Sequence, residues 1–372
     1  MVQLILNRLL LADLSRGPVP ADGVWPFVSV VVPARNEERG IRAAVTSFCT
    51  LDYPSFEVIV VDDGSTDGTA AILADLQAEH ERLQVVTGVE PPPGWLGKPH
   101  ALEQGRGRAR GDWMLFVDAD VVYAPDLLRR AMAYAQVHEL GMLTLCPRVT
   151  TGGVIEAVLM SSVYLFAFAA TPMFLANRRR FGWVAAGVGS FNLVRREALE
   201  ACGAFASLPD SIIDDVMLGR KVKGAGYALH LGLAGPLIRV RMYESARAAV
   251  AGFAKNTFPA MRRRPWTIAV PFVLGMLVTV LPYYGFLRGL TLGTLNLPAA
   301  ISLAAMHLVL GGLAVWFRQP WPVAVLNPIR EFGWWWIVLR SMVLYYRRGL
   351  VWRGRNYGPI SSPRAPSNRS AS

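Results

Sequence analysis

The chain of 372 residues has little charge, few cysteines and almost no lysine. Charged residues make up 17% of it, against about 25% in an ordinary soluble domain, and a chain so poor in charge and rich in apolar residues is not intrinsically disordered. The three cysteines, Cys49, Cys146 and Cys202, lie far apart, which matches neither a zinc site nor a disulfide framework. We therefore expect a folded protein in a reducing compartment.

Nearly all the basic residues are arginines, although the formal net charge is +11. A lysine kept in such a chain is a candidate for a place where arginine does not serve. The lysines are Lys98, Lys221, Lys223 and Lys255. The isoelectric point of about 9.9 fits binding to nucleic acid, anionic lipid or phosphorylated substrates. The arginine clusters flank apolar segments rather than an aromatic-bearing sheet, so we do not expect a nucleic-acid partner.

Apolar residues are abundant, at 53% of the chain with a mean hydropathy of +0.32. An average soluble domain reaches about 45–50% only when glycine is counted, so a fully soluble protein is not expected. Two uncharged stretches, 266–287 and 289–317, exceed the roughly 20 residues that a helix needs to cross the hydrocarbon. We expect a transmembrane hairpin over residues 265–318; the alternative is two buried helices of a soluble core.

Arginines flank this hairpin on its outer sides, at 262–264 and at Arg318. The positive-inside rule then places both outer ends in the cytoplasm. We expect a multi-pass protein of the inner (cytoplasmic) membrane whose larger domain is cytoplasmic. Residues 246–264 would be an interfacial segment, and residues 319–357 an amphipathic helix at headgroup level, because Arg340 interrupts the apolar pattern of a third span.

The two ends of the chain predict no independent domain. Met1 to Ala12 is apolar but carries Asn7 and Arg8, and it is too short to span a bilayer. We expect residues 1–26 to be an interfacial anchor or helix stub followed by a proline-containing linker, rather than a cleaved signal peptide. Residues 358–372 are rich in Ser and Pro and are expected to be disordered.

Residues 27–245 alternate strands and helices at the spacing of βαβ units. Continuous apolar runs at 28–32, 57–61 and 113–117 are typical of strands buried on both faces. We expect an α/β domain with a Rossmann-like, mostly parallel sheet and helices on both faces. Ligands of such sheets bind beyond the carboxyl ends of the strands. Three polar clusters fall at these ends: Pro33–Glu37, Asp62–Thr66 and Asp118–Asp120.

Asp118 and Asp120 follow the third of these runs. Because residues i and i+2 point to the same face of a strand, we expect the two carboxylates to converge. Carboxylate oxygens suit Mg²⁺ or Mn²⁺, and such an ion can bridge two phosphates and stabilise a diphosphate leaving group. The alternative is a solvated turn.

Asp62 and Asp63 end the preceding apolar run. A cap on the following helix explains Ser65 or Thr66, but it does not require two carboxylates at the strand end. A carboxylate there can accept from the N3–H of uracil or the amine edge of guanine. Pro33–Glu37 closes the first strand in the same neighbourhood, although a simple Pro/Asn turn explains it too.

Asp214 and Asp215 open a predicted helix, where the helix dipole alone favours acidic residues. The functional alternative is a general base that removes a proton from an acceptor hydroxyl. Lys98 lies in a turn before another helix. It can contact a phosphate as a point charge or be solvated.

Five motifs together resemble one family, the inverting family 2 glycosyltransferases of GT-A fold. They are VSVVVPARNEE, VIVVDDGSTDGT, GWLGKPHAL, WMLFVDADV and IIDDVMLGRKVKGAGY, and they extend from about Val28 to Glu244. The GWLGKPHAL motif, the C-terminal hairpin and the ending GLVWRGRNYG look like the membrane-bound branch of that family. This branch includes ceramide glucosyltransferase-like enzymes and enzymes associated with hopanoid and carotenoid biosynthesis.

The resemblance implies a nucleotide pocket at the ends of the first two strands. Pro33, Arg35 and Glu37 would line this pocket, and Asp63 would bind the base. The donor would be a UDP- or GDP-sugar.

The resemblance also implies a metal site and a catalytic base. Asp118 would contact the nucleotide-sugar and, with Asp120, hold Mg²⁺ or Mn²⁺ at the diphosphate, with Lys98 nearby. Asp215 would be the catalytic base, and it follows Asp214, where the family usually has Glu.

The implied reaction is the transfer of one sugar to a lipid hydroxyl at the cytoplasmic membrane face. The Gln-x-x-Arg-Trp motif of processive synthases is absent after Asp215, which disfavours polysaccharide synthesis. A membrane-anchored nucleotide-sugar-binding protein without turnover is an alternative, and a transporter would need oligomers to enclose a path. The apolar stretch 157–176, followed by Arg178–Arg180, is either a buried helix or a membrane-surface element along which the lipid reaches Asp215.

Overall fold

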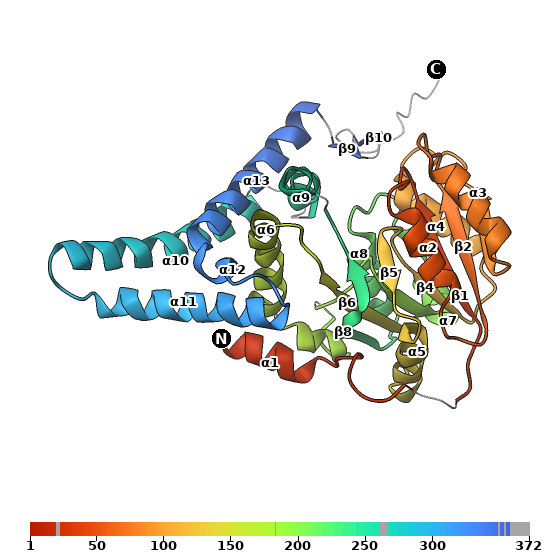
Figure 1. Cartoon of the computed structure of the whole chain (residues 1–372), viewed down its shortest axis with the longest axis horizontal. Coiled ribbons are helices and arrows are strands. Elements are labelled where there is room, and N and C mark those ends of the chain that lie inside the picture. The colour runs from red at the N-terminus through yellow and green to blue at the C-terminus, as the bar shows by residue number, and fades with distance from the viewer. Residues whose placement is uncertain are drawn as a thin grey trace, which may run out of the picture.

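The computed structural model of the chain describes residues 1–19, 23–182, 184–243, 245–260, 266–348, 350–352 and 355–357. An α/β domain lies on one side of the molecule, and a group of long helices extends from its other side (Figure 1). The predicted disordered tail at 358–372 and the arginines at 262–264 lie outside the described residues.

An eight-stranded sheet in the order β3-β2-β1-β4-β7-β6-β8-β5 forms the centre of the α/β domain. The four strands from β3 to β4 are parallel, β7 runs antiparallel to both of its neighbours, and β6 and β8 are parallel. The strands are β1 (Val28–Ala34), β2 (Phe56–Asp62), β3 (Leu83–Thr87), β4 (Trp113–Phe116), β5 (Val121–Tyr123), β6 (Met142–Val149), β7 (Asn192–Arg195) and β8 (Leu229–Val240). The expected α/β fold is confirmed, with a more mixed sheet than the sequence indicates.

Helices cover both faces of this sheet, which explains the continuous apolar runs. In β1, the side chains of Val28, Val30 and Val32 pack with α2, α3 and α5, whereas Val31 packs with α4, α7 and α8 on the other face. The helices are α2 (Ile41–Cys49), α3 (Thr69–Glu79), α4 (Gly97–Arg108), α5 (Leu127–Val137), α7 (Arg196–Ala201) and α8 (Asp214–Gly224). A strand buried on both faces needs no polar alternation.

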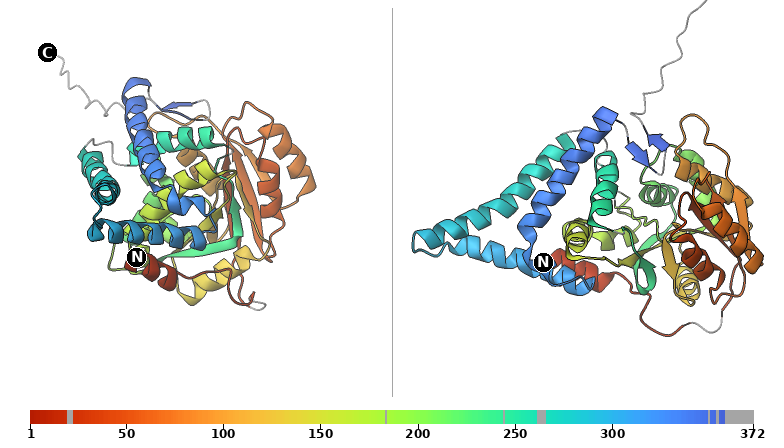
Figure 2. Two further views of the ribbon diagram at one scale, coloured as in Figure 1. Left: turned by 60° about the vertical axis from the view of Figure 1, so that its left-hand side comes forward. Right: turned by 45° about the horizontal axis from the view of Figure 1, so that its top comes forward.

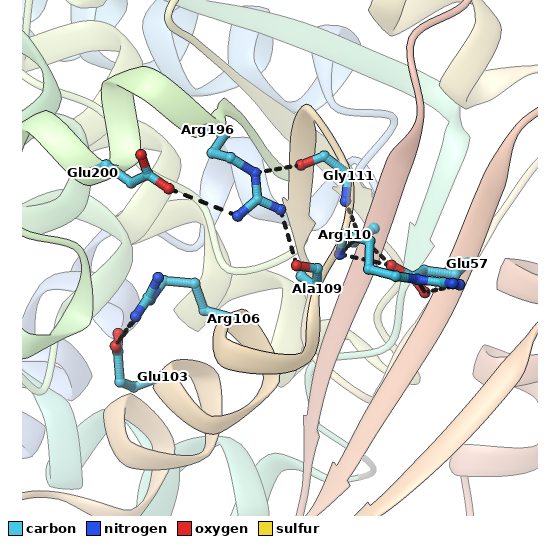
Figure 3. A network of polar contacts seen from close by, with 9 residues as sticks. Glu57, Glu103, Arg106, Ala109, Arg110, Gly111, Arg196 and Glu200 are labelled. Atoms are coloured by element: carbon cyan, nitrogen blue, oxygen red, sulfur yellow. Dashed lines mark hydrogen bonds and ion pairs between the residues drawn. The ribbon is translucent and has the colours of Figure 1, made fainter.

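A polar network fixes the amino edge of the parallel strands, opposite the predicted site (Figure 3). Glu57 of β2 accepts hydrogen bonds from the Ser29 hydroxyl at 2.7 Å and from the Arg110 guanidinium at 2.8 and 3.0 Å. Arg196 donates to the carbonyls of Ala109 and Gly111, each at 2.9 Å. These bonds hold the turn between α4 and β4 against β1, β2 and the start of α7.

The long helices α10 (Trp266–Thr291), α11 (Leu297–Trp316) and α13 (Asn327–Arg348) form three sides of a triangle beside the α/β domain (Figure 2). Within the described chain, the stretches Ala269–Thr291 and Leu297–Trp316 are long and apolar enough to cross a membrane, with a mean hydropathy of 1.8 each. Few of their residues are buried by the rest of the protein. Their surface is therefore suited to lipid.

Helix α13 carries an apolar stripe on one face and a buried ion pair on the other. The exposed stripe recurs every three or four residues, as on one face of a helix. It consists of Ile329, Phe332, Trp336, Leu339, Val343 and Tyr346. On the buried face, Arg330 and Glu331 pair at 2.8 Å, and Glu331 also accepts from the Trp335 indole at 2.6 Å. Arg330 and Glu331 therefore belong to the contact between α13 and α10. Gly275 of α10 leaves room there for the Glu331 carboxylate.

Helix α6 (Val154–Tyr164) and helix α1 (Val2–Leu10) connect the two parts. Most side chains of α6 are buried, as in the buried-helix interpretation of the stretch 157–176, whereas Phe166 in the following π-helix Leu165–Ala170 is exposed. The amide of Asn7 in α1 donates to the carbonyls of Phe168 and Thr171, both at 2.8 Å. This buried asparagine fixes α1 beside the π-helix.

Candidate active site

The ends of β1 and β2 form the first part of the site. The Asp63 amide donates to the Ala34 carbonyl at 2.8 Å, and the Arg35 guanidinium donates to the Asp63 carbonyl oxygen. Asp63 is buried, and the next residue, Gly64, has a φ of +69°, a conformation that favours glycine. The sequence prediction that Arg35 and Asp63 lie together agrees with these contacts.

Asn36 joins the two loops that follow these strands. Its φ is 53°, its amide donates to the Ser65 hydroxyl at 3.0 Å, and its side-chain oxygen accepts from the Thr66 amide at 2.8 Å. Ser65 and Thr66 therefore do not cap α3, contrary to the sequence expectation. The N-cap residue of α3 is Gly68, and the Asp67 carboxylate just before it accepts from the Thr69 amide at 3.0 Å.

Pro33 and Glu37 flank this loop. Pro33 lies in the last part of β1, opposite Val61 of β2. The Glu37 amide donates to the Thr69 hydroxyl at 2.8 Å. The loop from β1 is thus anchored to the start of α3 by its backbone.

Three carboxylates surround Lys98 in the centre of the site. Lys98 lies in the first turn of α4, and its Nζ is 2.6 Å from Asp118 Oδ1 and 3.7 Å from Asp214 Oδ2. Asp214 and Asp215 form the first turn of α8, as predicted. Asp118 follows β4, so the structure brings together residues from three separate motifs.

The charges of this cluster shift one another's pKa values. Burial acts to lower the pKa of Lys98, but Asp118, Asp214 and Asp215 together raise it above its ordinary value. Burial raises the pKa of Asp214 to about 7, against the opposing effect of Lys98. Burial also raises the pKa of Asp215. A carboxylate whose pKa is raised toward neutrality is a better general base than an ordinary surface Asp.

A glycine-containing segment, 185–191, passes between Asp118 and Asp215. The Asp118 amide donates to the Gly189 carbonyl at 2.9 Å. A Cβ on Gly189 would collide with the Asp118 carboxylate, and a Cβ on Gly187 would collide with the carbonyl of Asp215. These two glycines were not predicted as site residues; the only sequence signal is a run of small residues, AAGVGS, before β7.

Asp120 is not among the residues that line the cavity beside Lys98. Strand β4 ends at Phe116, so Asp118 and Asp120 lie in the following turn, and the expected strand alternation does not apply to them. The pKa of the Tyr243 phenol is raised to about 12, mainly by burial and further by the negative charge of Asp120. Across the described residues there is no group of three or more His, Cys, Asp or Glu side chains that could hold a metal ion.

A cavity of only about 10 Å³ lies inside the cluster, about the space of one water molecule. Its lining includes Lys98, Asp118, Gly189, Asn192, Asp214 and Asp215. Asp63 lies two strands away along the same edge, because β1 separates β2 from β4; at about 4.8 Å per strand this is roughly 10 Å. A ligand reaching both would lie across the carboxyl edge of the sheet, over the cavity.

The fold and the acidic carboxyl edge define a class of protein, the GT-A glycosyltransferases. The chain superposes on the mannosyltransferase PcManGT from Pyrobaculum calidifontis, solved in complex with GDP-Man and Mn²⁺, with a TM-score of 0.52 and 21% identity. The match covers 89% of this chain and 93% of that structure. At this identity the likeness establishes the fold.

The chain belongs to glycosyl transferase family 21, whose family model matches residues 1–362. This confirms the resemblance to GT-A glycosyltransferases that the motifs indicate, under family number 21 rather than 2.

Curated relatives carry names of glycosyltransferases. The chain is 30% identical over 198 residues to the beta-monoglucosyldiacylglycerol synthase of Nostoc sp., covering 53% of this chain and 41% of that protein. It is 26% identical over 345 residues to the 4,4'-diaponeurosporenoate glycosyltransferase of Staphylococcus aureus, covering 89% and 88% of the two chains. The chain thus spans less than half the length of the cyanobacterial relative that it matches.

Proposed function

We propose that this protein is an inverting glycosyltransferase that moves one sugar from a nucleoside-diphosphate sugar to a lipid hydroxyl at the cytoplasmic membrane face. The observation that carries the proposal is the meeting of Lys98, Asp118, Asp214 and Asp215 at the carboxyl edge of the sheet. Taking a lysine and three carboxylates partly out of water costs desolvation free energy, and such clusters of perturbed charges are concentrated at functional sites.

The donor would lie across the ends of β2, β1 and β4. Asp63 would accept a hydrogen bond from the base, and Arg35, Pro33 and Glu37 would line the nucleotide pocket. Lys98 would face the diphosphate as a compact positive charge. The base of the donor would then lie at the end of β2, and its sugar would lie near the start of α8.

Asp118 and Asp120 would hold a divalent ion together with the diphosphate. Their donor set fits the group, because Mg²⁺ is usually bound by one or two carboxylates and substrate phosphates rather than by a complete protein cage. When bound, Mg²⁺ or Mn²⁺ would neutralise charge that develops on the departing diphosphate.

Asp215 would act as the general base, because it is the more exposed carboxylate of the pair at the start of α8. The Asp214 side chain is only 7% exposed and lies 3.7 Å from Lys98, so it would orient Lys98. Asp215 would take the proton of the acceptor hydroxyl as its oxygen bonds to the anomeric carbon. The bond from that carbon to the diphosphate oxygen breaks on the opposite side, which inverts the configuration.

The acceptor would come from the membrane. Two helices of membrane-spanning length and the exposed apolar stripe of α13 support this assignment, as do relatives named for glucosyldiacylglycerol and diaponeurosporenoate. The stripe would lie at headgroup level, with both outer ends of the α10–α11 hairpin on the cytoplasmic side. The protein would thus be a multi-pass inner-membrane enzyme.

The direct test is to incubate membranes containing the protein with radiolabelled UDP- and GDP-sugars and Mn²⁺, and then to extract the lipids. We expect label in the organic phase with at least one donor, and about 10²–10⁴-fold slower labelling with Asp215→Asn. Label in a high-molecular-weight product would favour a polysaccharide synthase instead. Nucleotide binding without any labelled product would favour the non-catalytic binding protein.

A further inference from the structure

Lys223, in the last turn of α8, lies inside a cage of backbone carbonyls. Its ammonium donates to the carbonyl oxygens of Ala176, Phe181 and Val184 at 2.9, 3.0 and 2.9 Å, and a fourth, that of Arg178, lies at 3.2 Å. One side chain therefore gathers four peptide groups of a segment that forms no regular sheet or α-helix.

The segment whose carbonyls surround the Lys223 ammonium continues along α8 toward the active site. Three successive contacts show its direction: Val184 with Lys223, Ala186 with Gly219, and Gly187 with Asp215. The segment therefore runs antiparallel to α8. A Cβ on Gly219 would collide with the Ala186 carbonyl, just as one on Gly187 would collide with the carbonyl of Asp215. The packing leaves almost no freedom for this segment to slide along α8.

The far end of the segment contacts both acidic motifs. Gly189 accepts from the Asp118 amide at 2.9 Å and donates a backbone hydrogen bond to Asp215 that acts to lower the pKa of that carboxylate. Beyond it, the Tyr123 hydroxyl donates to the Ser190 carbonyl at 2.6 Å. The placement of Asp118 relative to Asp215 therefore depends on where this segment lies.

We propose that Lys223 is a positioning residue, which fixes residues 176–182 and 184–189 along α8 and thereby sets the distance between Asp118 and Asp215. The proposal rests on the proposed glycosyl transfer, for which these two carboxylates must face the donor and the acceptor at once. Lys223 itself is a full helix length from Asp215 and contacts no predicted substrate group.

The chemistry of the cage explains why lysine occupies this position in a chain that has almost no other lysine. An ammonium offers three hydrogens around a single nitrogen and can serve several converging carbonyls. The guanidinium of arginine is planar, and its donors diverge as a fork. Arginine would therefore satisfy part of the cage and push the remaining carbonyls away.

The test compares Lys223→Met with Lys221→Met, an exposed position on the same helix, in the full-length protein in lipid vesicles. For Lys223→Met we expect kcat for sugar transfer to fall about 10–100-fold, the loss caused by a displacement of about 1 Å near the reacting atoms. Donor affinity, measured by nucleotide binding, should stay within about twofold, because Arg35 and Asp63 directly follow β1 and β2 and do not contact this segment. Lys221→Met should match the wild type in both.

Two further variants test the positioning role if Lys223→Met folds poorly. Lys223→Arg keeps the charge and should fold, yet we expect it to lose kcat with unchanged donor binding. Lys223→Ala should regain kcat on addition of ethylamine, whose ammonium can enter the cage, whereas Lys221→Ala should not respond.

Equal kcat values for Lys223→Met and Lys221→Met, or a loss of donor binding as large as the loss of kcat, would overturn the positioning role. A wild-type protein without transfer activity would instead overturn the proposed function. In that case hydrogen exchange of amides 184–189 still tests the cage, because it should increase in Lys223→Met and not in Lys221→Met.

Discussion

Individual charged residues of the site were predictable, because their chemistry is visible in the sequence. Asp214 and Asp215 begin a helix as expected. The Nζ of Lys98 lies 2.6 Å from Oδ1 of Asp118. Gly187 and Gly189 were not predicted, because their importance is steric and depends on two distant segments meeting at one backbone. The same holds for Lys223, whose partners are carbonyl groups that every residue carries.

Asp215→Asn should lower kcat by about 10²–10⁴-fold, the usual contribution of a general base, and leave donor binding nearly unchanged. The measurement is single-turnover transfer together with nucleotide binding by calorimetry. Asp210→Asn, an exposed position shortly before α8, is the matched control and should behave as the wild type. Loss of donor binding with intact turnover would reverse the assignment.

Gly187→Ala adds only one methyl group, yet it should strongly reduce the activity of the protein. The added Cβ would meet the carbonyl of Asp215, so the start of α8 must move away from Asp118. We expect at least about a 10-fold loss of kcat. Gly182→Ala, in the same segment but with no atom within 4 Å of its added Cβ, should retain activity; equal losses in both would refute the steric account.

Among the elements, those with continuous apolar runs were predictable and the antiparallel strands were not. β1, β2 and β4 are buried on both faces, so their composition alone identifies them. β5 and β7 contain three and four residues, too few for a periodic signal. β8 contains Gly232, Gly235 and Pro236, and these residues usually indicate turns rather than a strand interior.

The network at the amino edge of the sheet should make stability depend on pH. Burial acts to raise the pKa of Glu57, but hydrogen bonds from Arg110 and Ser29 outweigh it, and the pKa is lowered overall. A lowered carboxyl pKa stabilises the fold above the unfolded value of about 4.3, and this contribution is lost as pH falls through the folded pKa. Glu57→Gln should reduce stability at pH 7 by about 2 kcal/mol.

Thermal melting in detergent between pH 3 and 7 measures this effect. The melting temperature of the wild type should fall more steeply below about pH 4.3 than that of Glu57→Gln, because only the wild type loses the charged Glu57. Glu79→Gln is the control, since its contact with Arg42, at 3.4 Å, is exposed. Parallel curves for the wild type and Glu57→Gln would contradict the role of this network.

The exposed stripe of α13 should contact lipid. Trp336 is 52% exposed, whereas the neighbouring Trp335 is 7% exposed and bonded to Glu331. In vesicles with lipids brominated near the headgroup, Trp336→Phe should remove much of the quenching of tryptophan fluorescence, and Trp335→Phe should leave it nearly unchanged. Equal quenching in Trp336→Phe and the wild type would place this face away from the bilayer.

In the whole molecule, the composition divides the chain into a charged α/β domain and an apolar group of helices. The excess of apolar residues predicted the second part, and α10 and α11 lie where the uncharged stretches indicated. The sequence could not show that α1 and α6 join the two parts, because their burial results from contacts with segments more than 100 residues away, such as Asn7 with Phe168. The site thus lies at the carboxyl edge of the sheet, the same edge from which β6 leads into α6, and α6 in turn contacts α11 and α13.

The most direct measurement is an experimental structure of the protein in a lipid nanodisc with a nucleoside diphosphate and Mn²⁺. The account predicts the base beside Asp63, the diphosphate between Lys98 and Asp118, and Asp215 facing the vacant sugar position. A nucleotide bound at the amino edge of the sheet, or one that reaches Asp63 while Asp215 faces another side, would contradict it.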